Sequence, residues 1–349
     1  GLDENNNTVY FASAERSPMH RDIYSVQLNG KNKTILSNKV GTNSATFSAN
    51  YKYFINKYSN ANMPYYFSLF DAKGNEVRML KDNASLKTTL SEYALSQKEF
   101  FNFNTSEGIN LNGWMMKPHD FDESKQYPVF MYLYGGPGSQ QVTDSWGGSN
   151  FMWYQMLTQQ GYIVACVDNR GTGARGTEFK KCTYQQLGKL ETQDQIEANR
   201  YLAGLPYIDG SRIGIFGWSY GGYMSSLCLL KGAEYFKMAI AVAPVTNWRY
   251  YDTIYTERYM RTPQENASGY DDNSPINHVE KLKGNYLLVH GSADDNVHYQ
   301  NTMEMVNALI NSNKQFDLFI YPNKNHGIYG GFTRLHLFTK MTNFIKENL

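Results

Sequence analysis

The sequence predicts an α/β chain whose larger part is a doubly wound sheet, preceded by a short series of antiparallel strands. Three observations favour this fold. A strand, a tight turn with a serine and a helix follow one another at residues 213–230. Apolar strands alternate with helical segments on both sides of that turn. The first 95 residues instead repeat short aromatic strands, so we expect one domain at residues 1–95 and another at residues 96–349.

The turn at residues 213–230 contains Gly-x-Ser-x-Gly with Ser219 at its apex. This pattern, between an apolar strand and an apolar helix, is typical of a nucleophile elbow, a strained turn that lifts a serine hydroxyl above a sheet. A side chain on Gly217 or Gly221 would crowd the turn. We therefore interpret Ser219 as a nucleophile that forms acyl-enzymes on an α/β-hydrolase sheet.

A triad on this fold needs an acid and then a histidine, each in a loop after a later strand. Residues 286–290 read as a buried strand, and the acidic loop after it offers either Asp294 or Asp295. His326 follows the next predicted strand and is the expected general base,. The other histidines precede the elbow or lack such a loop, and His290, which ends a strand, is expected to be a satisfied core residue.

Acyl transfer also requires hydrogen-bond donors for the oxyanion. One expected donor is the backbone N–H of Tyr220, at the positive end of the helix that begins there,. A second should come from the loop after an earlier strand. Residues 129–134 read as such a strand and lead into the glycine-rich loop 135–138. This loop is a candidate wall of the oxyanion hole, although a plain glycine turn would have the same spacing.

A longer signature follows the elbow at residues 241–260, Ala-Val-Ala-Pro-Val-Thr-Asn-Trp-Arg-Tyr-Tyr-Asp-Thr-Ile-Tyr-Thr-Glu-Arg-Tyr-Met. Together with Gly-Trp-Ser-Tyr-Gly-Gly, Ala-Asp-Asp-Asn-Val-His and Asn-x-Asn-His-Gly-Ile, it makes residues 96–349 resemble the dipeptidyl peptidase IV group of the prolyl oligopeptidase family, bacterial dipeptidyl and prolyl tripeptidyl peptidases included. The resemblance implies that Ser219, Asp294 and His326 form the triad.

The resemblance further implies that the phenol of Tyr134 donates to the oxyanion, and that an aromatic pocket binds proline at the residue before the scissile bond. A pyrrolidine ring is rigid and apolar and lacks an N–H, so aromatic walls can enclose it without leaving a donor unpaired. Alanine should also be tolerated. An alternative for Tyr251 and Tyr255, at i and i+4, is core packing as part of a helix stripe,. The expected pocket residues are Tyr220, Val245, Trp248, Tyr251, Tyr255, Asn296 and Val297.

The first part of the chain repeats at the period of a propeller blade. Tyr10-Phe11 recurs 43 positions later as Tyr53-Phe54, and each pair is followed by a second aromatic strand. About two blades cannot close a propeller, so we expect the chain to be a fragment. In the family that it resembles, missing blades carry the glutamates and the arginine that bind the substrate's N-terminus and carbonyl. The chain alone is therefore expected to be poorly active or to lose exopeptidase character.

These features predict a serine exopeptidase that cleaves after proline or alanine near the N-terminus and releases Xaa-Pro dipeptides. The alternatives are a prolyl tripeptidyl peptidase, an acyl-peptide hydrolase or esterase on the same fold, and an inactive binding protein. The intact triad residues argue against the last. Dipeptide and tripeptide release cannot be separated, because the deciding glutamates are expected outside this chain.

Charge and composition exclude other classes. The 33 basic and 32 acidic residues are dispersed, which predicts no binding to nucleic acid, and no stretch approaches 18 apolar residues, which predicts no membrane span,. Cysteines and histidines lack metal-ligand spacing. Residues 171–176 approach a dinucleotide-binding pattern, but no ribose-binding acid follows,. We therefore expect no metal and no cofactor.

The remaining expectations concern partners and location. The C-terminal segments 297–312 and 335–348 have apolar residues at helical spacing,. The resemblance implies that such segments pair two subunits, so a homodimer is expected. It also implies a periplasmic, secreted or cell-surface location.

Overall fold

The computed structural model describes residues 1–148 and 150–349, and the chain divides into two compact units. The division differs from the domains expected from the sequence mainly because residues 142–155 join the blade-like unit. Compact units are not the same as domains, so the expected domain boundary between residues 95 and 96 stays a prediction. The first unit comprises Gly1–Lys98 and Val142–Gln155, and the second comprises Glu99–Gln141 and Met156–Leu349.

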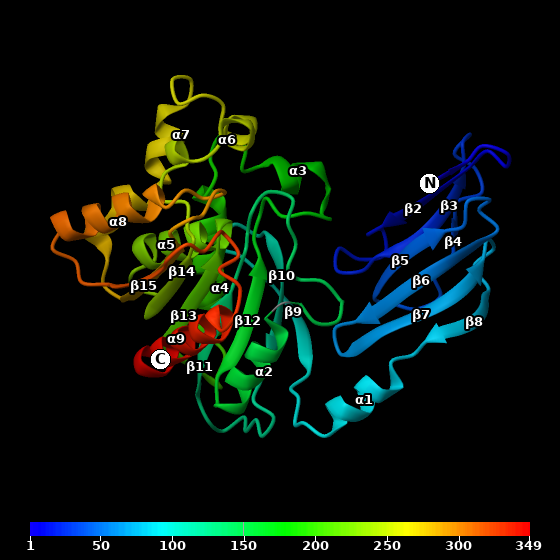
Figure 1. Cartoon of the computed structure of the whole chain (residues 1–349), viewed down its shortest axis with the longest axis horizontal. Helices are drawn as coiled ribbons and strands as arrows, with labels where there is room; N and C mark the ends of the chain where they lie inside the picture. The colour runs from blue at the N-terminus through cyan, green and yellow to red at the C-terminus, as the bar shows by residue number, and fades with distance from the viewer. Residues whose placement is uncertain (149) are drawn as a thin grey trace. The chain divides into compact units, whose positions relative to one another are not determined.

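The first unit contains two four-stranded antiparallel sheets, each with its strands in chain order, which is the architecture of propeller blades (Figure 1),. The first sheet contains β1 (Leu2–Asp3), β2 (Thr8–Ser13), β3 (Asp22–Gln27) and β4 (Thr34–Ile35). The second contains β5 (Thr42–Phe47), β6 (Tyr53–Asn60), β7 (Met63–Asp71) and β8 (Glu76–Lys81), and α1 (Ala84–Ser91) follows it.

The repeat in the sequence corresponds to these two sheets. Tyr10 and Phe11 lie in the middle of β2, and Tyr53 and Phe54 begin β6; each of these is the second strand of its sheet. The two pairs bury different members. In the first pair the tyrosine, Tyr10, is buried (7% exposed), whereas in the second pair the phenylalanine, Phe54, is buried (1%) and Tyr53 is exposed (47%). Since side chains alternate between the faces of a strand, the blades share a topology but differ by one residue in register. A small core joins Tyr10, Ile23, Leu36, Phe54 and Phe70.

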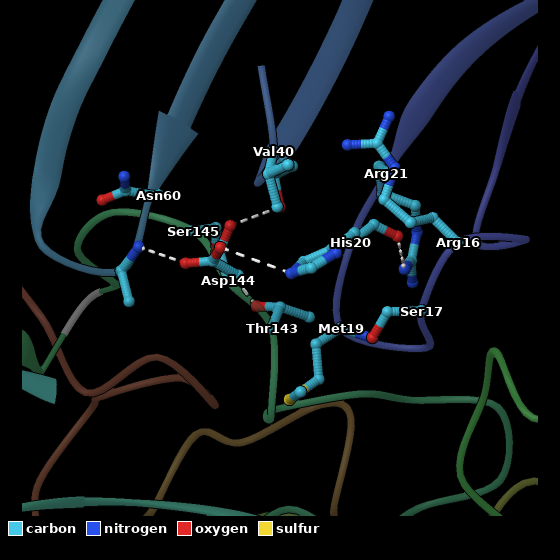
Figure 2. A network of polar contacts seen from close by, with 12 residues as sticks. Arg16, Ser17, Met19, His20, Arg21, Val40, Asn60, Thr143, Asp144 and Ser145 are labelled. Carbon is cyan, nitrogen blue, oxygen red and sulfur yellow. Dashed lines mark hydrogen bonds and ion pairs between the residues drawn. The ribbon is translucent and has the colours of Figure 1, made fainter. Parts of the chain in front are cut away.

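Asp144 holds the segment 142–155 in the first unit (Figure 2). Its backbone N–H donates to the carbonyl of Met19 at 2.9 Å, and its carboxylate accepts from the backbone N–H of Ala61 at 2.7 Å. The carboxylate also lies 3.5 Å from Nε2 of His20. The hydroxyl of Thr42 donates to the Asp144 carbonyl at 2.8 Å. One residue thus connects loops of both sheets.

The second unit is built on one eight-stranded sheet of order β16-β15-β14-β13-β11-β12-β10-β9. The strands from β16 to β12 pair in parallel, and β10 is antiparallel to β12. This arrangement confirms the predicted fold class. The strands are β9 (Lys98–Asn104), β10 (Asn110–Met116), β11 (Tyr127–Tyr132), β12 (Ile163–Asp168), β13 (Ile208–Trp218), β14 (Met238–Val242), β15 (Asn285–Gly291) and β16 (Asp317–Tyr321).

Both faces of the sheet are covered, as a parallel sheet requires. Successive residues Val129, Phe130 and Met131 of β11 all have no exposed surface. Helices α4 and α5 pack on β13, and α9 lies on the face toward the viewer in Figure 1. Helix α2 (Phe151–Gln159) spans the boundary between the units at residues 155 and 156. The helices wholly within the second unit are α3 (Gly176–Lys181), α4 (Lys189–Ala203), α5 (Tyr220–Lys231), α6 (Thr253–Met260), α7 (Ala267–Asp272), α8 (Gln300–Asn311) and α9 (Thr333–Asn348), with 3₁₀ turns at Trp248–Tyr250 and Pro275–Lys281.

The two C-terminal helices expected from the sequence are present as α8 and α9. Helix α8 begins three residues later than expected, because residues 297–299 still belong to the turn after β15. In the part of the chain that the structure describes, no helix combines the length and the apolar character needed to cross a membrane.

Candidate active site

Ser219 stands at a sharp turn between β13 and α5. Its backbone has φ 60° and ψ −119°, a strained conformation for a residue with a side chain, and its N–H donates to the carbonyl of Val242 at 2.8 Å,. A Cβ on Gly217 would lie 2.1 Å from the backbone of Gly221, and one on Gly221 would lie 2.4 Å from the carbonyl of Leu133. The expectation that side chains here would crowd the elbow is confirmed.

The loops after β15 and β16 bring one aspartate to one histidine. Nδ1 of His326 lies 2.7 Å from Oδ2 of Asp294. Asp294 is buried (6%), whereas its neighbour Asp295 is exposed. The indole N–H of Trp218, the residue before the elbow serine, donates to the carbonyl of His326 at 3.0 Å. The loop that contains His326 is thereby hydrogen-bonded to the end of β13, directly before Ser219.

The carboxylate of Asp294 is held by four donors. Oδ1 accepts from the backbone N–H groups of Asn296 and Val297 at 2.9 and 3.0 Å. Oδ2 faces His326 and also lies 3.2 Å from Nε2 of His290. Burial by itself would raise the pKa of Asp294, but the hydrogen bonds from His290, His326 and the backbone outweigh burial and hold it well below its usual range,. The aspartate therefore stays ionised at neutral pH.

His290 contributes more than the core packing expected from the sequence. It is fully buried, and its Nε2 lies 2.8 Å from the carbonyl of Val297 while its Nδ1 lies 2.7 Å from the hydroxyl of Thr302. Because a carbonyl oxygen only accepts, Nε2 must carry a hydrogen, and the same N–H points toward Asp294. Sequence reasoning missed this contact. The sequence feature that could have indicated this contact is the position of His290 near the end of β15, four residues before Asp294.

The two expected oxyanion donors, Tyr220 and Tyr134, have neighbouring rings beside the elbow. The backbone N–H of Tyr220 has no acceptor among the described residues, as expected for the first turn of a helix,. The Tyr134 phenol likewise makes no hydrogen bond with any described residue, and burial raises the pKa of this phenol, which keeps it protonated. The two rings are 6.0 Å apart. A Cβ on Gly136 would lie 2.9 Å from the Tyr134 ring and 3.1 Å from the Tyr220 ring, so the glycine loop leaves space for both.

The residues expected to form a proline pocket lie in one aromatic cluster beside the elbow. The Trp248 ring lies 5.6 Å from Tyr220, 5.8 Å from Tyr251 and 5.9 Å from Tyr255. The Tyr251 hydroxyl donates to Oδ1 of Asn296 at 2.7 Å, which places the amide next to the cluster. The same apolar core contains Val245 and Val297, both buried.

Tyr251 and Tyr255 both pack against the apolar core, as the alternative of core packing expects, but they do not share a helix. Tyr251 has extended backbone angles of φ −112° and ψ 164°, and α6 begins only at Thr253. The two rings meet edge to face at 5.3 Å across the start of that helix. Their contact therefore depends on the turn at residues 248–250 and not on helical periodicity.

The loop 171–176 supports the glycine-rich loop after β11. The N–H of Gly138 donates to the carbonyl of Gly171, and the N–H of Gly173 donates to the carbonyl of Ser139, both at 2.8 Å. A Cβ on Gly173 would lie 2.8 Å from the carbonyl of Gly138. These glycines thus serve a close backbone contact. Within residues 1–148 and 150–349, no group of three or more His, Cys, Asp or Glu residues could hold a metal ion.

Comparison with known proteins identifies the family of this chain. A sequence model of the prolyl oligopeptidase family matches residues 149–349, more than half of the chain. The chain belongs to the prolyl oligopeptidase family. A second model, of the N-terminal region of dipeptidyl peptidase IV, matches residues 1–65, which contain the first blade-like sheet and strands β5 and β6 of the second.

Several similar proteins of this family are dipeptidyl peptidases by name. The crystal structure of Porphyromonas gingivalis dipeptidyl peptidase 4 is 52% identical, with a TM-score of 0.96, and the match covers 100% of this chain and 49% of that one. Human dipeptidyl peptidase 8 is 36% identical over 363 residues, covering 100% of this chain and 40% of the relative. "Probable dipeptidyl-aminopeptidase B" of Arthroderma benhamiae is 41% identical over 337 residues, covering 94% and 37%. The chain thus spans half or less of the length of these relatives.

Proposed function

We propose that this chain is the catalytic part of a serine dipeptidyl peptidase that cleaves after proline or alanine. Ser219 is the nucleophile, His326 the general base and Asp294 the acid that orients it. The observation that carries the proposal is the 2.7 Å contact between Asp294 and His326, held against the elbow by Trp218. The names of the similar family members support the reaction class.

The reaction begins when His326 removes the proton of the Ser219 hydroxyl as its oxygen attacks the carbonyl carbon of the scissile bond. The tetrahedral intermediate collapses when His326 returns that proton to the leaving amine, which leaves an acyl-enzyme. A water molecule, deprotonated by His326, then attacks the acyl-enzyme. The second tetrahedral intermediate collapses as His326 returns the proton to Ser219, and the peptide product leaves with a new carboxyl group. The ionised carboxylate of Asp294 keeps the proton of His326 on Nδ1 and stabilises the imidazolium in each half.

The oxyanion of both intermediates accepts from the backbone N–H of Tyr220 and the phenol of Tyr134. Neither donor has a competing acceptor among the described residues, so neither must break a bond to serve the oxyanion. The low polarity that raises the pKa of Tyr134 also strengthens the hydrogen bond that it donates to a developing charge,.

Proline preference follows from the aromatic cluster next to Ser219. Flat walls from Tyr220, Trp248 and Tyr255 suit a rigid ring that brings no N–H into the pocket,. Alanine fits the same space with fewer contacts, and one lost or added methylene is worth only about 1 to 3 kcal/mol. Selectivity for proline over alanine is therefore expected to be modest.

Labelling and cleavage assays test the proposal. A serine-directed phosphonate should form an adduct at Ser219 in the folded chain, and no adduct would favour an inactive binding protein. Cleavage of Gly-Pro-p-nitroanilide should exceed that of Gly-Leu-p-nitroanilide. Hydrolysis of a simple ester without cleavage after proline would instead favour the esterase or acyl-peptide hydrolase reading. Products from a peptide with proline at positions 2 and 3 distinguish dipeptide from tripeptide release.

We also infer that exopeptidase recognition requires residues beyond this chain. The similar dipeptidyl peptidases are at least twice as long, and the two blades here are fewer than a closed propeller contains,. An N-terminally extended version with a complete propeller should therefore cleave Gly-Pro-p-nitroanilide with a higher kcat/KM than this chain. Equal values in the two proteins would contradict the inference.

A further inference from the structure

A buried carboxylate next to the candidate active site has no part in the mechanism above. Glu191 belongs to the first turn of α4, and its side chain has no exposed surface (0%). Burial raises the pKa of Glu191 to about 7, against hydrogen bonds that favour the ionised form,. Removing a carboxylate from water is costly, so the contacts of this group decide what it contributes.

The Glu191 carboxylate contacts the residue that follows the nucleophile. Oε1 accepts a hydrogen bond from the phenol of Tyr220 at 2.9 Å, across 29 positions of sequence. No described residue forms a hydrogen bond with Oε2. The bond to Tyr220 therefore joins the first turn of α4 to the first residue of α5.

Tyr220 presents two groups to the candidate site, its backbone N–H beside Ser219 and its ring in the aromatic cluster. The ring lies 5.6 Å from Trp248 and 6.0 Å from Tyr134. Helix α5 holds the backbone end of this residue, and Glu191 holds the far tip of the ring. A tyrosine held at both ends cannot rotate about its side-chain torsions. The ring of Tyr220, as a pocket wall, and its backbone N–H therefore keep one geometry relative to each other.

Tyr223 shows that a buried phenol in this helix does not need a carboxylate. Its hydroxyl lies 2.8 Å from the carbonyl oxygens of Leu187 and Asn273, which are neutral acceptors. A hydrogen bond to a carboxylate is roughly twice as strong as one to a neutral acceptor. When Glu191 is ionised, above its pKa of about 7, the charged acceptor therefore lies at Tyr220, directly after Ser219, whereas Tyr223 one turn further along has neutral acceptors.

We propose that Glu191 is a positioning residue that holds Tyr220, and through it an oxyanion donor and one wall of the proline pocket, in reactive geometry. This inference rests on the proposed function, because Tyr220 has its role only there. The other ionisable groups that act on Glu191 or respond to it are Asp194 on the same helix, Cys182 after α3, and Tyr220 and Tyr223 on α5.

The test compares Glu191→Leu, Glu191→Gln and Tyr220→Phe with Tyr223→Phe as the matched control. Steady-state rates are measured with Gly-Pro-p-nitroanilide and with p-nitrophenyl acetate, an ester that needs the oxyanion donors but not the proline pocket. Near-ultraviolet circular dichroism normalises each rate to folded protein. Glu191→Leu and Tyr220→Phe should each lower kcat at least about 10-fold on both substrates, because small displacements of reacting groups cost that much or more.

The remaining variants separate positioning from general stability. Glu191→Gln should restore most of kcat, since an amide oxygen still accepts from the phenol, and Tyr223→Phe should lower the melting temperature without lowering kcat. The double variant of Glu191→Leu and Tyr220→Phe should be no slower than the slower single variant. Wild-type kcat in folded Tyr220→Phe, or equal losses in Glu191→Gln and Glu191→Leu, would overturn the proposal. Failure on both substrates of the unsubstituted chain and also of the N-terminally extended protein with a complete propeller would instead count against the proposed function.

Discussion

The two units of this chain bury polar side chains with different results. In the blade unit, buried Ser37 donates to Asp22 at 2.7 Å, and Asn56 donates to Asn43 at 3.0 Å, so these contacts join one strand or loop to the next. In the α/β unit, the buried side chains of Asp294, His290 and Glu191 lead toward the residues around the elbow serine.

This difference shows that a buried hydrogen bond has no single meaning across one chain. Contacts that join strands contribute to the free energy of unfolding, typically about 1 kcal/mol each. Contacts that converge on a reacting group also decide the position of that group. Substitutions in the blade unit should therefore lower the free energy of unfolding, whereas matched substitutions around Ser219 in the α/β unit should lower kcat.

The largest expected effect is that of Ser219→Ala. Removing the nucleophile should lower kcat by about 10⁶-fold, as it does when a catalytic serine is replaced. The free energy of unfolding should not fall, because the substitution removes no buried hydrogen bond and leaves the strained backbone of the elbow unchanged. Hydrolysis of Gly-Pro-p-nitroanilide and thermal unfolding measure the two effects. A variant with more than a hundredth of the original rate would remove Ser219 from the mechanism.

The two adjacent aspartates provide the next test. Asp294→Asn should lower kcat by about 10⁴-fold, because the amide no longer holds the proton of His326 on Nδ1,. Asp295→Asn, at an exposed position one residue away, should change kcat by less than about 2-fold,. The same assay measures both variants, and equal losses would contradict the assignment of Asp294.

Loss of one oxyanion donor is a smaller effect. Tyr134→Phe should lower kcat by about 10²-fold, mainly with KM unchanged, because the phenol acts on charge that develops only in the intermediate. The matched variant is Tyr58→Phe in the blade unit, whose hydroxyl donates to the carbonyl of Val40 at 2.7 Å. It should lower stability and leave kcat unchanged. An unchanged kcat in Tyr134→Phe would exclude it as a donor.

The pH dependence of stability distinguishes the buried acid Glu191 from Glu residues at the surface. Burial raises its folded-state pKa to about 7, above the unfolded value near 4.5. Its protonated form is therefore favoured by folding, and this contribution is complete below about pH 4.5 and is lost as pH rises through about 7. At pH 8, Glu191→Gln should be more stable than the parent by an amount on the order of 3 kcal/mol. Urea unfolding at pH 5 and pH 8 tests this, and equal differences at both pH values would contradict it.

The smallest effect is expected from Ser37→Ala, the blade counterpart of Ser219→Ala. Its hydroxyl donates to Asp22 and accepts from the backbone N–H of Ile23 at 3.2 Å. Losing both bonds should lower the free energy of unfolding of the blade unit by about 1 to 2 kcal/mol. Phosphonate labelling at Ser219 should keep its rate. A slower rate of labelling in the folded variant would show that the units are coupled in function.

Local patterns account for what could be predicted. The elbow depends on residues adjacent in sequence, since the clash between Gly217 and Gly221 arises within one turn. The blade period follows from strands that pair with their neighbours along the chain. The contact between Tyr251 and Tyr255 was harder to predict. Their spacing of four residues suggested one helix, but α6 begins at Thr253, after Tyr251.

By itself, the sequence determined the fold class and the elbow, and it predicted the order of nucleophile, acid and base along the chain. From the residues alone it left Asp294 and Asp295 as alternatives, and only the tertiary structure placed Asp294 against His326 and gave it a second imidazole from His290. The structure alone also brought Glu191 to Tyr220. The physical reason is that motifs describe steric limits between neighbours, whereas these contacts arise where parallel strands bring the loops at their carboxyl ends to one edge of the sheet.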